Sequence, residues 1–350
     1  MSAPAFRGGL LALLAAVLFG LSTPLVQHFG QGLGAFTTAA LLYAGAAAVA
    51  VLMRRPPERE AALRRSDLPR MLAMAVFGAV VGPVALAWGL QRTSGSSASL
   101  MLTLEALFTV VLAWRLYGET MDKRVGAAML LLLAGGMALV LEQGLAGDTQ
   151  LLGLLAVLAA TAAWGIDNTL SRGVAERDPG QVVFLKSALG ACATVSLAFL
   201  FHEPVPGIIA AAWLLVIGAA GYGLSLRLYL LAQRAFGAGR TGSVFAFAPF
   251  IGALGAFAFG SRSGTWMLAL GGVLMLGGVV LHLLESHGHG HKHETLDHEH
   301  AHTHDDGHHQ HTHDAVMSGQ PGQSHSHWHR HEPMRHEHPH VPDAHHLHPH

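Results

Sequence analysis

Ten long apolar stretches fill the first 285 residues of the chain and leave few folds open to it. Windows of about 19 apolar residues are typical of helices that cross a lipid bilayer. The expected spans cover residues 8–26, 34–53, 70–90, 94–114, 124–142, 151–170, 181–200, 211–232, 240–259 and 265–284. Because lipid offers the backbone no hydrogen-bond partners, each span should be helical. The sequence therefore predicts an all-α polytopic membrane protein with ten transmembrane helices.

The composition agrees with this prediction and narrows the chemistry. Only 12% of the residues are charged, about half the share found in soluble domains. The single cysteine, Cys192, excludes a disulfide framework and a cluster of thiolate metal ligands. The sequence contains no phosphate-binding GxxxxGKS/T loop and no catalytic constellation. We therefore expect a protein that is not an enzyme.

Lysine and arginine lie unevenly in the loops that alternate along the chain, and this bias predicts the orientation. One set of loops and the N-terminal segment carries Arg7, Arg54, Arg55, Arg59, Arg64, Arg65, Arg70, Arg115, Lys123, Arg124, Arg172, Arg177, Arg234 and Arg240, whereas the other set carries only Arg92 and Arg262. The loop at 142–150 is among those without such a charge. We expect a multi-pass protein of a bacterial-type inner (plasma) membrane with both termini in the cytoplasm, and no nucleic-acid partner.

The two halves of the chain share a pattern at a constant offset of 142 residues. Gln91-Arg92, Phe108 and Gly135-Gly136 recur as Gln233-Arg234, Phe250 and Gly277-Gly278. Five spans in each half place the halves in opposite orientations, as in the inverted repeats of secondary transporters. The predicted organisation is a first repeat over residues 1–145, a second over 146–285, and a tail over 286–350.

The segment LQRTSGSSASLMLTLEALFTVVLAWRLYGE, followed by a Gly-Gly span, resembles the EamA-type repeat of the drug/metabolite transporter superfamily. The second half resembles the same repeat through WGIDNTLSRGVAERDPGQVVFLKSALG. The resemblance implies a ten-helix exporter of metabolites, amino acids, drugs or metal ions, often coupled to protons. Two departures stand out: Glu105 precedes Ala106 rather than proline, and Gly260-Ser261 replaces the Gly118-Glu119 of the first repeat.

Polar residues inside the spans are candidates for a transport cavity because a charge at the bilayer centre costs at least ~2.5 kcal/mol. Glu105 lies near the middle of its span, and its alternative role is that of a structural carboxylate. Asp167 and Lys186 are expected to form an ion pair, while Arg227 would line the cavity or extend to the interface. Ser22, Thr23 and Asn168 complete the predicted set, with Pro24 and Pro249 as candidate helix breaks and Trp88 and Trp164 as candidate wall residues.

The tail over 286–350 contains 23 of the 26 histidines and few apolar side chains. Such a composition predicts a segment that is disordered without metal, whose imidazoles bind Ni(II), Co(II), Zn(II) or Cu(II) at several weak sites. The candidate ligands are His287, His289, His291, His293, His298, His300, His302, His304, His308, His309, His311, His313, His325, His327, His329 and His331. The alternative is a pH-responsive solubilising segment.

Together these patterns predict a secondary transporter that exports a small solute and requires no cofactor. Two substrates remain open: divalent metal ions collected by the tail, or a metabolite, amino acid or drug with the tail regulatory. Proton coupling and a homodimer are further expectations. A membrane-anchored metal sensor or store is the alternative from another class, although an anchor needs only one span.

Overall fold

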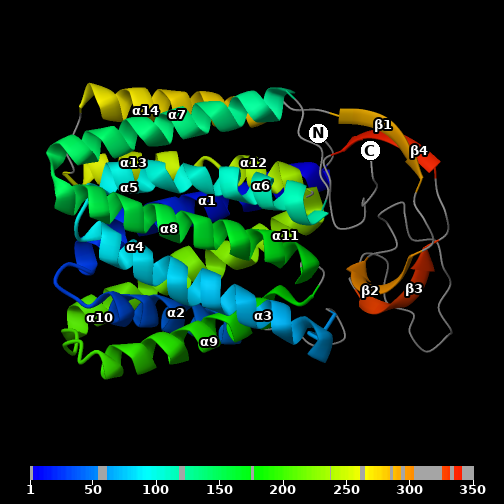
Figure 1. The fold of residues 1–350 in the computed structure, drawn as a ribbon. Coiled ribbons are helices and arrows are strands. Elements are labelled where there is room, and N and C mark those ends of the chain that lie inside the picture. The colour runs from blue at the N-terminus through cyan, green and yellow to red at the C-terminus, as the bar shows by residue number, and fades with distance from the viewer. Residues whose placement is uncertain are drawn as a thin grey trace.

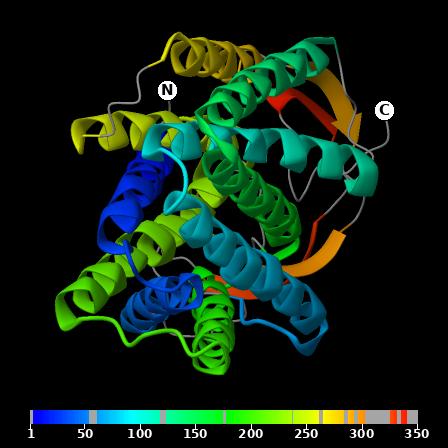
Figure 2. The same ribbon diagram turned by 60° about the vertical axis from the view of Figure 1, so that its left-hand side comes forward.

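The computed structural model describes residues 3–53, 61–117, 123–174, 177–236, 238–260 and 265–283, together with four short strands between 287 and 340. Long helices lie side by side and form one bundle (Figures 1 and 2). We call the end where α1 begins and α14 ends the terminal end, and the opposite end the far end.

The first half consists of α1 (Ala3–Phe29), α2 (Ala35–Leu52), α3 (Leu68–Met74), α4 (Gly82–Leu90), α5 (Gly95–Met101), α6 (Glu105–Tyr117) and α7 (Lys123–Ala146). A π-helical turn, Ala75–Val81, joins α3 to α4, and a 3-10 turn, Leu102–Leu104, joins α5 to α6. Helices α3 and α4 therefore make one interrupted span, and α5 and α6 make another. Short 3-10 turns also occur at Arg65–Asp67 and Arg172–Val174.

The second half consists of α8 (Asp148–Ser171), α9 (Pro179–Leu200), α10 (Ile208–Ile217), α11 (Ser225–Phe236), α12 (Ala238–Phe245), α13 (Ala248–Ala258) and α14 (Trp266–Leu283). A π-helical turn, Gly218–Leu224, joins α10 to α11. The two π turns lie at corresponding places in the halves, 143 residues apart. Such turns are rare and often occur at functional sites.

Helix lengths and exposed side chains confirm the predicted membrane fold. Eight spans in the described residues are long and apolar enough to cross a bilayer, and Ala248–Ala258 and Trp266–Leu281 are shorter apolar helices. Large apolar side chains point outward, for example Leu130 and Val273, each 68% exposed. A surface of this kind is stable against lipid and unfavourable in water. The chain is a polytopic, all-α membrane protein.

The helices pair as an inverted repeat requires. Each contact joins one half to the other: the third span of the first half packs through α4 on α8, and the third span of the second half packs through α11 on α1. The other pairs are α2 with α9, α5 with α13, and α7 with α14. Each second span packs through a glycine on the third span of the other half, because Gly45 of α2 lies against α10 and its counterpart Gly190 of α9 lies against the first π turn. Close helix approach without a hydrophobic driving force depends on such residues.

Two local features differ from the sequence expectations. The expected loop at 142–150 is almost wholly helical, because Gly147 adopts φ +134 and turns the chain between α7 and α8 in a single residue; only glycine adopts this conformation readily. Pro24 lies inside an unbroken α1, whereas the ninth span does break, and Pro249 occupies the first turn of α13 after the break.

The structure describes four short strands in the histidine tail, and the expectation that this segment is disordered without metal stays a prediction. The strands are β1 (His287–Lys292), β2 (Leu296–His302), β3 (His325–His331) and β4 (Arg335–His340), paired antiparallel as β1–β4 and β2–β3. Histidine at alternate positions matches the period of a strand, which explains the pairing. An isolated two-stranded pair is only marginally stable in water. The candidate ligands His293, His304, His308, His309, His311 and His313 lie outside the described residues.

Candidate functional site

A cavity between the two halves extends from the bundle centre toward the terminal end. Phe19, Tyr43 and Glu105 line it from the first half, and Trp164, Asp167, Asn168, Lys186, Gly221, Tyr222, Ser225, Leu226, Tyr229 and Phe245 from the second. Its volume is about 60 Å³, enough for about four to six water-sized groups. The cavity therefore holds a small molecule or one end of a larger one.

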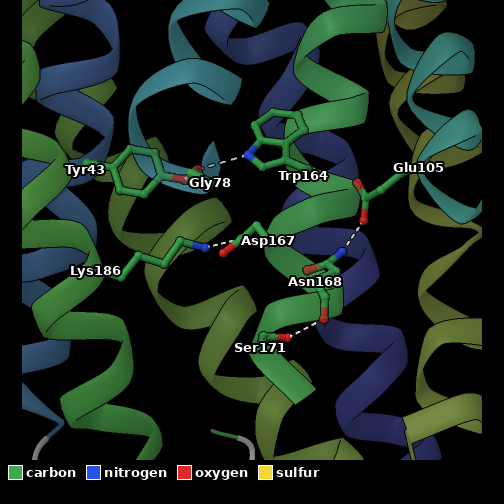
Figure 3. A network of polar contacts seen from close by, with 8 residues as sticks. All are labelled: Tyr43, Gly78, Glu105, Trp164, Asp167, Asn168, Ser171 and Lys186. Carbon is green, nitrogen blue, oxygen red and sulfur yellow. Dashed lines mark hydrogen bonds and ion pairs between the residues drawn. The ribbon is translucent and has the colours of Figure 1, made fainter. Parts of the chain in front are cut away.

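The predicted ion pair lies in the wall of this cavity. Lys186 Nζ on α9 donates to Asp167 Oδ2 on α8, and each residue is only 3% exposed (Figure 3). The second carboxylate oxygen, Oδ1, is buried without a hydrogen-bond partner. Neighbouring opposite charges offset the cost of removing two ions from water. The predicted contact is confirmed, and one acceptor of Asp167 remains unused.

Glu105 enters the cavity from the other side of α8. Its backbone follows the 3-10 turn Leu102–Leu104 and begins α6, so its side chain leaves the span at an interruption of the helix. Asn168 Nδ2 donates to Glu105 Oε1, and Ser171 Oγ donates to the Asn168 carbonyl at 2.8 Å (Figure 3). Glu105 is thus bonded to a neutral amide, whereas the Asp167 carboxylate is bonded to an ammonium.

The first π turn brings a backbone carbonyl to the same wall. Gly78 O accepts from the Tyr43 hydroxyl and, at 3.0 Å, from Trp164 Nε1 (Figure 3). The Asp167 carboxylate packs so closely on Gly78 that a Cβ there would overlap it. A glycine in the π turn therefore fixes the positions of a tyrosine, a tryptophan and the ion pair together.

Aromatic rings form most of the remaining wall. The Phe19 ring centroid lies 5.6 Å from Trp164, 5.9 Å from Tyr222 and 5.4 Å from Phe245. Tyr229 continues the wall, with its ring 5.0 Å from that of Phe245. Edge-to-face pairs at these distances hold rings in fixed orientations. Sequence reasoning selected only Trp164 from this group.

Other predicted site residues lie elsewhere. Ser22 and Thr23 are buried within α1, where Ser22 Oγ donates to Phe19 O at 2.6 Å, and neither is among the described residues that line the cavity. Arg227 donates to Met53 O at the terminal end of α2, in keeping with the expectation that it extends to the interface. Trp88 is 37% exposed with Arg92 over its ring. Their transport roles remain predictions.

The far end is closed by a polar network that the sequence did not indicate. Glu142, 6% exposed, accepts from the Thr265 hydroxyl and, at 3.4 Å, from Ser97. Gln143 donates to Ser97 Oγ at 3.2 Å and accepts from Thr93 at 2.9 Å. Because Glu142 belongs to the first half and Thr265 to the second, the network links the halves.

A second link between the halves lies at the far end. Glu203, between α9 and α10, accepts from the backbone N–H groups of Phe36 at 3.1 Å and Thr37 at 2.7 Å. The carboxylate therefore caps the N-terminus of α2, where negative charge is favoured. Two carboxylates, one from each half, thus fasten the end opposite the cavity.

The residues that the structure describes contain no group of three or more His, Cys, Asp or Glu side chains arranged to hold a metal ion. Metal ligation by the tail remains a prediction.

Comparison with known proteins identifies the class. The sequence matches the EamA-like transporter family over residues 6–141 and again over 151–284. The chain belongs to this family. It is 25% identical over 286 residues to an uncharacterized transporter of Methanothermobacter thermautotrophicus, covering 76% of this chain and 83% of that protein. A crystal structure matches with a TM-score of 0.55 and 20% identity, over 80% of this chain and 96% of that one.

These matches confirm the resemblance drawn from the sequence. The family match makes the chain a membrane transporter, and the crystal structure shows the same fold. Two matches in one chain agree with the two halves that the helix pairing describes.

Proposed function

We propose that this transporter exports a small solute from the cytoplasm by a secondary mechanism in which Glu105 is the titratable group. The observation that carries the proposal is the cavity itself. Charged and polar groups from both halves meet there, Glu105 from the first and Asp167 and Lys186 from the second. Inverted-repeat transporters bind substrate at such an interface, and ionisable groups inside a membrane are placed there for function.

The proposed direction rests on the position of the cavity and the distribution of charge. The terminal end carries the loops that are rich in lysine and arginine, and the positive-inside rule assigns that end to the cytoplasm of an inner membrane. A cavity that extends toward this end would load its solute from the cytoplasm. A reporter fused after Met53 should then be active in the cytoplasm, and one inserted at Gly147 on the other side.

The proposed cycle alternates between this state and one with the far end open. For the far end to open, the bonds of Glu142 to Thr265 and of Glu203 to α2 must break, since both link the two halves. Solute or a proton at Glu105 would change the charge balance of the cavity and so the relative stability of the two states. The far-end bonds and the cavity charges then both set the equilibrium between the two states.

Transport into everted inner-membrane vesicles tests the proposal. Vesicles with the full-length protein should accumulate at least one solute from a panel of amines, amino acids, sugars and organic acids when a proton gradient is present. Glu105→Gln should abolish this accumulation, and Asp148→Asn, which removes an exposed carboxylate at the start of α8, should not. Accumulation that is unaffected by Glu105→Gln would remove Glu105 from the mechanism.

Divalent metal export is a second candidate, and the tail favours it. The register of the paired strands sets histidine opposite histidine at six positions, for example His289 opposite His338 and His300 opposite His327. A tethered segment with many imidazoles would raise the local concentration of Ni(II), Co(II) or Zn(II) near the transporter.

Metal accumulation in cells separates the two candidates. Cells expressing the full chain should retain less Ni(II), Co(II) or Zn(II) than cells without it. Deletion of 286–350 should raise the retained metal most at low external metal concentration. Equal metal content in cells with and without the protein, combined with export of an organic solute, would eliminate metal efflux.

A further inference from the structure

With both of its carboxylates ionised, the cavity carries one negative charge in excess. Of its described lining residues, Glu105 and Asp167 are carboxylates and Lys186 is the one ammonium. Lys186 is bonded to Asp167, while Glu105 is bonded to the neutral Asn168 amide. A buried uncompensated charge is strongly unfavourable. A ligand with a single positive charge would balance the cavity.

The walls favour an organic cation over a metal ion. Rings of Phe19, Trp164 and Tyr222 lie within 5.6–6.4 Å of one another. The faces of such rings attract ammonium groups. Ni(II), Co(II) and Zn(II) prefer imidazole or thiolate ligands, and the described lining contains neither. The Lys186 ammonium would in addition repel a dication.

An unused hydrogen-bond acceptor points to a protonated amine. The Asn168 bond occupies only one of the two Glu105 oxygens. A protonated amine can donate an N–H to the other oxygen, whereas a quaternary ammonium has no N–H donor. The volume of about 60 Å³ admits such a head group with a short carbon chain.

We propose that this site binds a small organic molecule through a protonated amine, which lies against Glu105 among the rings of Phe19, Trp164 and Tyr222. This assignment rests on the proposed function, because it names the substrate class of the same cavity. It goes beyond that function by separating amines from alcohols, acids and metal ions of similar size.

Calorimetric titration of the purified full-length protein in detergent tests the assignment with three probes of equal length. n-Propylamine should bind at least tenfold more tightly than n-propanol, and propionate should bind more weakly still. Equal affinity for n-propylamine and n-propanol, or no binding of n-propylamine, would overturn the assignment. This comparison needs only the unaltered protein, so it decides the question even if a variant fails to fold.

Variants then locate the binding. Glu105→Gln should raise the Kd of n-propylamine at least tenfold, with Asp148→Asn as the matched control that leaves it unchanged. Tyr222→Leu should raise the Kd severalfold, whereas Tyr222→Phe, which keeps the ring, should stay within twofold. Unaltered affinity in both Glu105→Gln and Tyr222→Leu would place the amine elsewhere and refute the site.

The two proposals fail in distinguishable ways. Binding of n-propylamine that depends on Glu105, with no solute accumulated in vesicles, would refute export and leave the amine site. Accumulation of a sugar or an organic acid by a protein that does not bind n-propylamine would refute the amine site and leave export.

Discussion

The ion pair between Asp167 and Lys186 gives the most direct test of how the buried charges stabilise the fold. Both side chains are almost fully enclosed, 5% and 4% exposed respectively. Asp167→Asn or Lys186→Met alone leaves one charge buried without its partner, which should lower the free energy of unfolding by about 3–5 kcal/mol. The double variant removes both charges at similar volume, so its loss should be much smaller than either single loss.

The expected coupling between the two positions is therefore about 3 kcal/mol or more. Unfolding of the purified protein by a denaturing detergent, followed through loss of helical circular dichroism, measures the four free energies of the cycle. The Asp67–Arg177 pair, at 2.9 Å and with side chains 9% and 15% exposed, is the matched control. Its coupling should be about 1 kcal/mol, because water reaches it more easily. Losses at Asp167 and Lys186 that add within ~0.5 kcal/mol would refute the reasoning.

Three further predictions follow from the same geometry. Glu105→Gln should leave the helical content unchanged and reduce transport to the background level at every pH, because the variant lacks the titratable group. Transport that still varies with pH as in the wild type would contradict this. Gly78→Ala should lower the free energy of unfolding by about 1–3 kcal/mol and also reduce transport, since the added methyl overpacks the π turn against the Asp167 carboxylate. An unchanged free energy of unfolding would show that the π turn accommodates the methyl without strain. Glu142→Gln should open the far end more often, because the amide oxygen accepts from Thr265 or Ser97 but not from both. Loss of one such bond, about 1.5–3 kcal/mol, should raise labelling of a Ser99→Cys variant, at a fully buried position of α5, by a membrane-impermeant thiol reagent at least tenfold. Unchanged labelling would exclude the network as a closure.

Hydropathy and charge were sufficient to predict the spans and the ion pair. Asp167 and Lys186 stand out as opposite charges in apolar helices, and pairing neutralises both inside the membrane, so their contact could be predicted from the sequence. The tilt and rotation of each helix could not be predicted from the sequence. Rings such as Phe19 and Tyr222 have the same hydropathy whether they face lipid or a cavity.

Two other features were missed for local reasons. The end of the fifth apolar window placed Glu142 in a loop, whereas Gly147 lets α7 continue past it. The π turn around Gly78 leaves no trace in hydropathy, because it changes backbone hydrogen bonding and not composition. Features of this kind depend on contacts between helices, which a single sequence does not encode directly.

The position of the buried pair also bears on how the chain enters the membrane during synthesis. A lone lysine or aspartate in a span costs about 2.5–3.5 kcal/mol on insertion scales, so α8 and α9 would each partition less readily alone. The pair joins consecutive helices separated only by residues 172–178, so the two charges can neutralise each other without the first half. Insertion of α8 and α9 as one hairpin is then favoured over insertion of one helix after the other, and loss of either charge should reduce the amount of protein that reaches the membrane.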